Sequence, residues 1–152
     1  MKSQKLILDQ TDSKIKSFVV VKKVTIPSSG WVHAIRLSLG MSLKQLGRRM
    51  NITAQSIKEI EVREKAGTIS INVLRQFGAS LRMKFIYGFI PENGTLTEMI
   101  EQRALEMAKE IVMRTSVNMS LEEQKNSEKR LRKAIKEKAL EIQQEMPKYL
   151  WD

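Results

Sequence analysis

The residues best suited to chemistry form a short polar run in the middle of the chain. Thr53, Ala54, Gln55, Ser56 and Glu59 are short or polar side chains that would share the outer side of one short helix. A glutamine amide pairs bidentately with adenine, an alanine can touch a thymine methyl group, and hydroxyl or carboxylate groups can bond to other base edges. The run therefore predicts contacts to DNA bases, with Gln55 as the leading candidate for direct readout.

Cationic and hydrogen-bonding residues on both sides of this run predict contacts to DNA phosphates. They are Ser42, Lys44, Gln45, Arg48, Arg49, Lys58, Arg63 and Lys65, and we expect Arg36 to extend the same basic rim. Exposed amides at the start of a helix capped by Ser42 would add a further phosphate ligand. Phosphate contacts fix the position of a protein on the duplex and make its affinity depend on salt, but they do not read sequence.

Other kinds of chemistry are poorly represented. The chain has no cysteine and one histidine, His33, which removes thiolate nucleophiles, cysteine zinc sites and most catalytic triads. We find no paired carboxylates, phosphate-binding loop or metal cluster, so the sequence predicts no enzyme, no cofactor and no metal. His33 is expected to be a solvated or core histidine, and the nine methionines are expected to fill the core.

The charge is unevenly distributed along the chain. The net charge is +10 at pH 7, with 16 Lys and Arg against 6 Asp and Glu in residues 1–95 and 11 against 11 in residues 96–152. We favour a division of labour, in which the basic residues 1–95 bind a polyanion and the neutral residues 96–152 provide solubility or bind another protein. The longest apolar stretch, residues 18–21, is too short to span a bilayer, and no signal peptide is recognisable. We therefore expect a cytoplasmic protein with no membrane partner.

The elements that would position the polar run are two short helices joined by a tight turn. A first helix from Trp31 ends at Gly40, and Ser42 with Gln45 forms a capping box for a second, residues 43–50. Thr53 caps a third, residues 54–61, after a turn at Asn51. This spacing is that of a helix-turn-helix. The expected buried residues are Val32, Ile35, Leu39, Leu43, Leu46, Met50, Ile52, Ile57 and Ile60, with Gly47 at the closest approach.

The remaining segments are predicted mostly as helices. Residues 62–68 look like a charged loop, and Ser70 caps a fourth helix that buries Ile71, Leu74, Phe77 and Leu81. Residues 84–90 are predicted as a strand, which needs a partner in residues 18–26 or in a second copy of itself. Residues 2–17 favour a short helix, and residues 18–26 are either helix or strand. Capping boxes at Thr95/Glu98 and Ser120/Glu123 start two long helices, the last reaching about Met146.

Several segments of this sequence resemble the mobile mystery protein A family, within the phage-repressor (XRE) class of helix-turn-helix proteins. They are Gly30, Trp31, Gln45, Leu46, Arg103, Ala104 and residues 34–36, 39–42, 51–53, 87–91, 119–124 and 150–152. The resemblance implies a small bacterial DNA-binding regulator with an antitoxin role. It also implies a neighbouring gene for mobile mystery protein B, which carries a Fic domain of the type that transfers AMP to proteins.

Three residues depart from the patterns of these families. Gly47 and Asn51 stand where such helix-turn-helix motifs more often have alanine and glycine. Thr97 and Glu101 are similar to the inhibitory helix of Fic antitoxins, but Gln102 stands where that helix has Gly or Asn.

Together these features predict a mainly all-α fold. It would be a phage-repressor-like helix-turn-helix bundle with one short β-strand and a C-terminal helical extension. Residues 1–29 would be a basic arm, helix or strand. Residues 30–94 would be the DNA-binding domain ending in the strand, and residues 95–152 a helical segment for dimerisation or partner binding.

The predicted function is that of a homodimeric repressor that binds a palindromic DNA operator, with its two third helices about 34 Å apart in successive major grooves. It would be the antitoxin and autorepressor of an operon that also encodes a Fic-domain toxin. The alternative is a protein-interaction antitoxin that neutralises the Fic toxin through its C-terminal helices and the apolar tail at residues 149–151, with DNA binding incidental.

Overall fold

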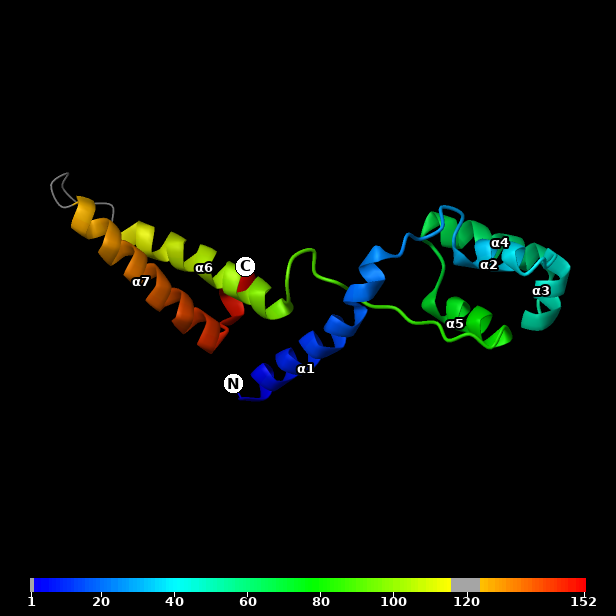
Figure 1. Cartoon of the computed structure of the whole chain (residues 1–152), viewed down its shortest axis with the longest axis horizontal. Helices are drawn as coiled ribbons and strands as arrows, with labels where there is room; N and C mark the ends of the chain where they lie inside the picture. The colour runs from blue at the N-terminus through cyan, green and yellow to red at the C-terminus, as the bar shows by residue number, and fades with distance from the viewer. Residues whose placement is uncertain (1, 116–123) are drawn as a thin grey trace. The chain divides into compact units, whose positions relative to one another are not determined.

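A computed structural model describes residues 2–115 and 124–152 and shows a mainly helical chain (Figure 1). No strand occurs in these two ranges, and none of their helices is both long and apolar enough to cross a membrane. Two compact units are present: Val20–Gly88, and Met1–Val19 together with Phe89–Asp152. The elements are α1 (Lys2–Phe18), the 3-10 helix η1 (Val19–Lys23), α2 (Trp31–Ser38), α3 (Leu43–Met50), α4 (Ala54–Ala66), α5 (Ile71–Ser80), α6 (Leu96–Thr115), α7 (Gln124–Glu145) and the 3-10 helix η3 (Lys148–Trp151).

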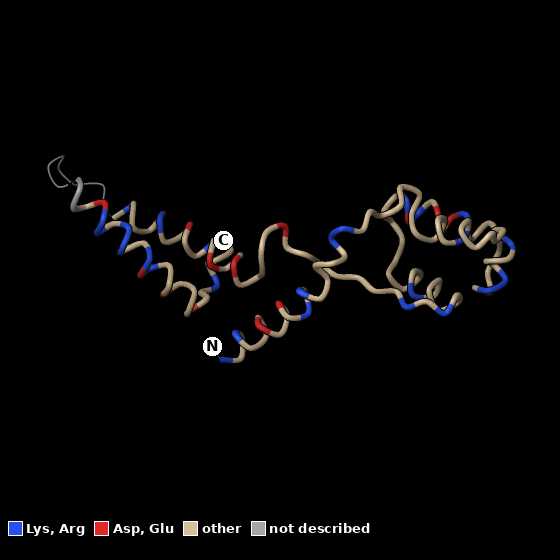
Figure 2. The backbone as a smooth tube through the Cα atoms, in the orientation of Figure 1, with Lys and Arg blue, Asp and Glu red and all other residues tan. Residues whose placement is uncertain are grey.

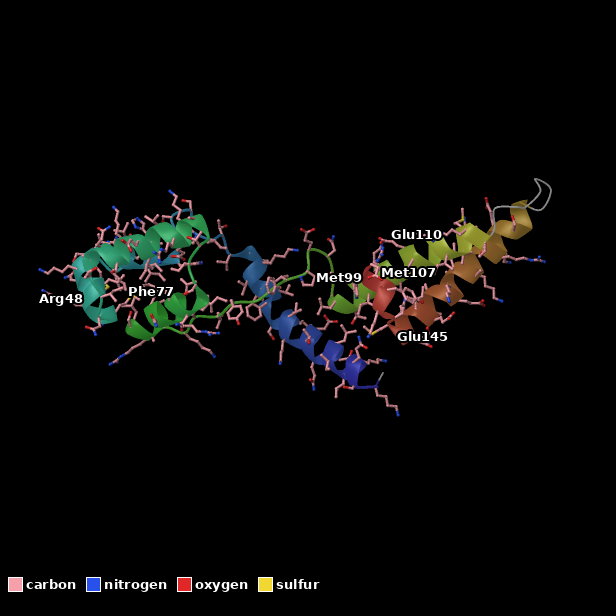
Figure 3. The ribbon with its side chains drawn as sticks, turned by 180° about the vertical axis from the view of Figure 1, so that it is seen from behind. Arg48, Phe77, Met99, Met107, Glu110 and Glu145 are labelled. Carbon is pink, nitrogen blue, oxygen red and sulfur yellow. The ribbon has the colours of Figure 1, made fainter. Side chains whose placement is uncertain are left out.

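The unit Val20–Gly88 packs α2 to α5 around a small apolar core. Val32, Leu46 and Ile57 are fully buried, and Phe77 of α5 points inward among them (Figure 3). Each of α3, α4 and α5 begins at a hydroxyl side chain that accepts a backbone N–H three residues later. Local capping therefore fixes the start of each helix, and burial of one face holds the four helices together.

The second unit is built on α6 and α7, which lie side by side as an antiparallel pair (Figure 1). Ala104, Ala108 and Ala139 are buried where these helices meet, and their small side chains allow a close approach. The carboxylate of Asp12 in α1 accepts the backbone N–H groups of Leu96 and Thr97, at 2.8 and 3.1 Å, and so caps α6 from outside. This contact satisfies donors that a helix start leaves unpaired.

The end of the chain is also tied to this unit. The Nε of Arg103 donates to the carbonyl oxygen of Leu150 at 2.7 Å, and its Nη2 donates to the backbone oxygen of Asp152 at 2.8 Å. The side chain of Leu150 is 1% exposed and belongs to the same core as Ile100 and Ile142. The C-terminal 3-10 helix is therefore part of the packed unit.

These units divide the chain differently from the sequence-based domains. We expected residues 1–29 to form a separate arm, but residues up to Val19 belong to the unit that contains α6 and α7. The reason is a pair of long-range contacts: Asp12 caps α6, and Leu8 packs against the core of that unit. Neither contact is visible in local periodicity.

The strand predicted at residues 84–90 is not formed. This stretch has no regular secondary structure, and residues 18–26 form the end of α1, the 3-10 helix η1 and a short loop. A strand is stable only when a neighbour pairs with its backbone, and helix formation through Lys23 removes the partner that we considered in the same chain.

Two further expectations are corrected, and a third lies outside the described residues. The helix predicted to stop at Glu61 continues to Ala66 and ends at Gly67, which has φ +75°, so residues 62–66 are helix and not loop. Leu39, Ile52 and Ile71 are exposed, although we expected them in the core. The predicted capping box at Ser120 and Glu123 lies outside the described residues.

Candidate nucleic-acid interface

The connection between α3 and α4 is a tight turn with specific steric demands. Asn51 adopts φ 57° and ψ 42°, the left-handed conformation that asparagine tolerates better than most residues. A side-chain carbon on Gly47 would lie 2.6 Å from the carbonyl oxygen of Ile52, so only glycine fits without a shift. The turn therefore accommodates Gly47 and Asn51, which stand where helix-turn-helix motifs more often have alanine and glycine.

The start of α3 carries the predicted capping box, and this affects how it could hold a phosphate. The hydroxyl of Ser42 accepts the N–H of Gln45 at 3.1 Å, and the side-chain oxygen of Gln45 accepts the N–H of Ser42 at 2.8 Å. The hydroxyl hydrogen of Ser42 and the side-chain amide of Gln45 remain able to donate. The backbone N–H groups of Leu43 and Lys44 are the remaining donors of the first turn.

At the start of α4, two of the predicted base-contacting residues bond to each other. The Oγ1 of Thr53 accepts the N–H of Ser56 at 3.1 Å, and the two hydroxyl oxygens lie 2.9 Å apart. One hydroxyl donates to the other, so only one of them can also donate to a base or phosphate. We predicted that Thr53 and Ser56 contact DNA independently, but the pair has only one hydroxyl hydrogen left to donate to a base or phosphate.

The outer side of α4 presents the other predicted residues. Gln55, Lys58 and Glu59 are exposed and Ala54 is half-buried, while Ile57 is fully buried on the opposite side. Val62, one to two turns further on, is also exposed. The helix thus separates a packed face from a short polar face beginning at its N-terminus, as the sequence predicted.

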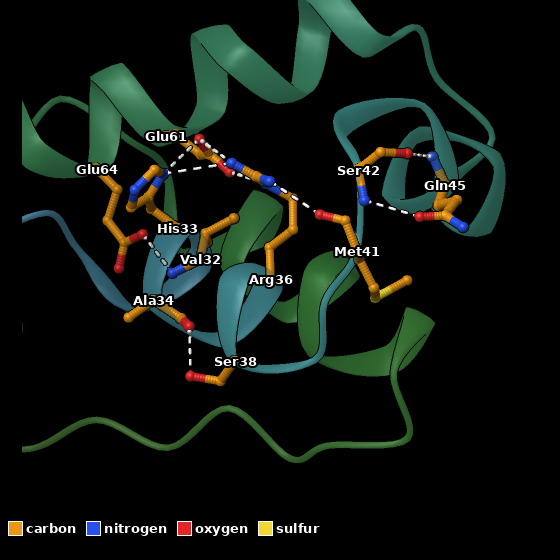
Figure 4. Close-up of polar contacts among 10 residues, drawn as sticks. All are labelled: Val32, His33, Ala34, Arg36, Ser38, Met41, Ser42, Gln45, Glu61 and Glu64. Carbon is orange, nitrogen blue, oxygen red and sulfur yellow. Dashed lines mark hydrogen bonds and ion pairs between the residues drawn. The ribbon is translucent and has the colours of Figure 1, made fainter.

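A buried ionic cluster holds α4 against α2 (Figure 4). The Nε and Nη2 of Arg36 donate to Glu61 at 2.5 and 3.2 Å, and Nη1 of Arg36 donates to the carbonyl oxygen of Met41 at 2.9 Å. The Nδ1 of His33 lies 2.9 Å from the same carboxylate. Arg36 therefore links three segments: α2, α4 and the loop that precedes α3. It is buried and is not part of the exposed basic rim that we expected.

A second carboxylate of α4 is also used inside the unit. The two oxygens of Glu64 accept the N–H groups of Trp31 and Val32, both at 2.8 Å, and cap the start of α2. This close contact leaves no room for a side chain at Gly30, where an added carbon would lie 2.8 Å from the Glu64 carboxylate. Glu61 and Glu64 together fix the position of α4 relative to α2.

The pKa of Glu61 reflects this environment. Burial favours the neutral acid and would raise the pKa, but hydrogen bonds from Arg36 and His33 and the charge of Arg36 outweigh it and hold the pKa below its usual range. The carboxylate is therefore ionised in the folded protein at neutral pH, as its pairing with Arg36 requires.

The unit Val20–Gly88 is strongly cationic. It contains 12 Lys and Arg against 3 Asp and Glu, a net charge of +9, whereas the rest of the chain carries 15 against 14. Two of its three carboxylates, Glu61 and Glu64, are engaged internally, so Glu59 is the one left on the outer side. Lys and Arg are visible along α3 (Figure 2), and Arg48 points away from the unit (Figure 3).

The predicted phosphate-contacting residues do not all fall in one place. Lys44, Arg48 and Arg49 are exposed on α3, with Lys44 in its first turn and Arg48 and Arg49 in its last turn, next to Asn51. Because α4 is longer than expected, Arg63 and Lys65 lie about 12 and 15 Å along the helix from Gln55. They are exposed, but they belong to the far end of α4 and not to a rim around its start.

Sequence reasoning missed the roles of Glu61 and Glu64, and it expected His33 to be a solvated or core histidine without naming Glu61 as its partner. A signal was present: Glu61 follows the buried Ile57 by four positions, and Arg36 follows the buried Val32 by four. Residues at this spacing share one helix face. Opposite charges on two inward faces indicate a buried pair.

Comparisons with known proteins give no match: no protein family, no curated protein and no solved structure matches this chain.

Proposed function

We propose that this chain is a sequence-specific DNA-binding regulator of the cytoplasm. In this proposal α3 and α4 form a helix-turn-helix of the phage-repressor kind, and two copies bind a palindromic operator. The protein catalyses no reaction and represses its own operon, which also encodes a Fic-domain toxin. The resemblance to the mobile mystery protein A family supports the identity of the operon partner.

One observation carries the DNA-binding part of the proposal. The start of α4 presents an exposed polar face next to the cationic α3, in a unit of net charge +9 whose carboxylates are mostly turned inward. A recognition helix needs short polar groups that can reach base edges, and its neighbours need positive charge toward phosphate. Both requirements are met within residues 42–59.

In the proposed complex α4 enters the major groove with its N-terminal turn. Gln55 reads a base through its amide, Ala54 contacts a thymine methyl group, and the hydroxyl pair of Thr53 and Ser56 supplies one donor. Lys44, Arg48 and Lys58 neutralise backbone phosphates, which gives affinity without sequence preference. Glu59 either accepts from cytosine or faces water.

The test is a comparison of two duplexes by fluorescence anisotropy. One duplex carries the region upstream of the gene, and the other carries the same bases in scrambled order. Specific regulators typically bind their site at least about 10³-fold more tightly than unrelated DNA. Equal affinity of the full-length protein for both duplexes would overturn the proposal.

Two substitutions separate readout from charge. Gln55→Ala is expected to reduce discrimination by about 1–3 kcal/mol, or about 5- to 150-fold. Gln76→Ala, which removes another exposed glutamine on α5, is the matched control and should leave discrimination unchanged. Lys58→Ala should weaken binding to both duplexes alike and reduce the slope of log affinity against log salt by about 0.9.

An observation within the other unit supports the antitoxin function through protein contact. Met99 and Trp151 are 45% and 59% exposed and line a shallow depression together with Pro91 and Arg103. Arg103 also fixes the backbone around Leu150, so this depression, which is lined by both apolar and charged residues, is held on a packed scaffold. Co-expression of Trp151→Ala with the neighbouring gene product should then abolish co-purification and growth rescue, while DNA binding persists. If Trp151→Ala still co-purified with the neighbouring gene product and still rescued growth, this surface would be excluded as the contact with the toxin.

A further inference from the structure

The stretch that was predicted as a strand has unusual features in the structure. Residues 84–90 lie outside every helix, and no backbone hydrogen bond within the described residues involves them. Ile86, Tyr87 and Phe89 are 61%, 55% and 85% exposed. A stretch with unpaired backbone groups and large exposed apolar side chains is a template for pairing with another strand.

The aromatic residues in this stretch are arranged symmetrically. Phe85, Tyr87 and Phe89 occupy alternate positions, and alternate residues of an extended chain share one face. The rings of Phe85 and Tyr87 are stacked with centroids 6.0 Å apart, which agrees with a shared face. Reversing the order Phe, Tyr, Phe leaves the pattern unchanged, so the stretch is complementary to an antiparallel copy of itself.

We infer that residues 84–90 pair with the same residues of a second copy of this chain to form a two-stranded antiparallel ribbon. The two-fold axis passes through the Tyr87 pair, and Phe85 of each copy faces Phe89 of the other. The proposed function requires two copies but does not say where they meet, and this inference names the surface.

The charges agree with this register. With Tyr87 opposite its own copy, Lys84 faces Ile90 and not another lysine, so no like charges lie opposite each other within residues 84–90. Opposite charges across an antiparallel pair stabilise it, whereas like charges directly opposite destabilise it. A shift by one residue would place the aromatic side chains of the two copies on opposite faces.

The amount of apolar surface is also suitable. The ribbon brings together the exposed Tyr87 and Phe89 and the half-buried Phe85 of each copy. A large aromatic side chain buries about 150–250 Å² when fully covered, so the exposed parts of these rings supply a portion of the roughly 1,200 Å² at which specific interfaces begin. Val20, Val24 and Ile26, in the unit that contains Phe85 and Tyr87, are 74%, 51% and 69% exposed, so that unit carries further exposed apolar side chains outside the ribbon.

The first test is the mass of the full-length protein in solution without DNA, by sedimentation equilibrium. We expect twice the 17.5 kDa of one chain. Tyr87→Asp should shift the protein to monomer, because it places two carboxylates opposite each other. Leu37→Asp is the matched control, since Leu37 lies on α2 of the same unit and is 56% exposed, and this variant should remain dimeric. A monomeric wild type, or a dimer unaffected by Tyr87→Asp, would overturn the inference.

The second test fixes the register and does not depend on destabilising the protein. The chain has no cysteine, so Tyr87→Cys introduces a single thiol. In the proposed ribbon the two thiols are opposite each other, with Cβ atoms about 4.5–5.5 Å apart, and mild oxidation should give a covalent dimer. Met83→Cys is the control: its two copies would be about 26 Å apart and should not cross-link. Equal cross-linking of both variants would contradict this register.

These measurements are made without DNA, so their failure is distinct from failure of the proposed function. A monomeric protein that still distinguishes the upstream duplex would retain the regulatory function and lose the ribbon. A dimer that cross-links through Tyr87→Cys but binds both duplexes equally would keep the ribbon and lose the sequence-specific function.

Discussion

The buried pair of Arg36 and Glu61 provides the sharpest prediction for the stability of the cationic unit. Glu61→Gln keeps the shape of the side chain but leaves the guanidinium of Arg36 without a counter-charge, in a site where the two side chains are 9% and 8% exposed. Removing one partner of a buried ion pair costs about 3–5 kcal/mol. We expect a loss of this size in the free energy of unfolding of the unit Val20–Gly88.

That loss is large compared with the stability available. Folded domains have about 0.05–0.15 kcal/mol of stability per residue, so a unit of the size of Val20–Gly88 has about 3–10 kcal/mol in total. Glu61→Gln should therefore remove a third or more of it. Since urea slopes are about 1–3 kcal/mol per molar, the unfolding midpoint should fall by at least about 1 M.

The two tryptophans allow the units to be followed separately. Trp31 belongs to the unit Val20–Gly88 and Trp151 to the other. In a Trp151→Phe background, urea unfolding followed by fluorescence reports on the cationic unit through Trp31. Glu59→Gln is the matched control, because it makes the same chemical change at an exposed position of the same helix, and it should change stability by no more than about 0.5 kcal/mol. Equal midpoints for the two variants would refute the role of the buried pair.

The same pair predicts a dependence on pH. The pKa of Glu61 is lower in the folded protein than the ordinary value of 4.5, so the folded state stabilises the ionised carboxylate. This contribution is fully present above pH 4.5 and is lost as the pH falls through the lower pKa of the folded state. Between these two values the wild type should lose stability more steeply than Glu61→Gln. Parallel curves would contradict the assignment.

Two further substitutions test the turn and the contact between α1 and α6. Gly47→Ala places a carbon 2.6 Å from the backbone oxygen of Ile52, so the turn must shift, and we expect a loss of about 1–3 kcal/mol by urea unfolding of the cationic unit. An unchanged midpoint would show that the turn yields at no cost. Asp12→Asn weakens the cap of α6 and should cost about 0.5–2 kcal/mol in the other unit, against no change for the exposed Asp9→Asn. Burial would raise the pKa of Asp12, but hydrogen bonds from Thr97 and Leu96 of α6 outweigh it and hold the pKa below 3.8. The stabilisation of the folded state by the ionised Asp12 should therefore fade as the pH falls below 3.8. An Asp12→Asn variant with the same dependence of stability on pH as the wild type would contradict this prediction.

Local chemistry explains which parts of the fold the sequence predicts well. The caps at Ser42, Thr53, Ser70 and Thr95 depend on one side chain and a backbone N–H three residues later, and all four form. The left-handed residue at Asn51 is similarly local. Because these contacts need no information from distant parts of the chain, residue types at fixed spacing are enough to predict them.

Contacts between distant segments explain the errors. The sequence predicts the end of α4 too early because residues 62–66 look like part of a charged loop when the partners of α4 are unknown. Glu61 and Glu64 bond to groups of α2 about thirty positions earlier, which makes an inward-facing charged helix stable. The strand at residues 84–90 depends on a partner strand, and the helical residues up to Lys23 do not supply it.

The arrangement of carboxylates is the one expected of the proposed DNA interface, and a helix pair that only packs does not require it. Glu61 and Glu64 stabilise the unit from within, and their negative charges are matched by Arg36 and by the amides of α2. Lys44, Arg48 and Lys58 are exposed, and none of them forms a salt bridge within the described ranges. Their mutual repulsion is an energetic cost that packing alone does not require. Binding a polyanion converts that repulsion into attraction, so the same side chains that weaken the free unit strengthen the complex.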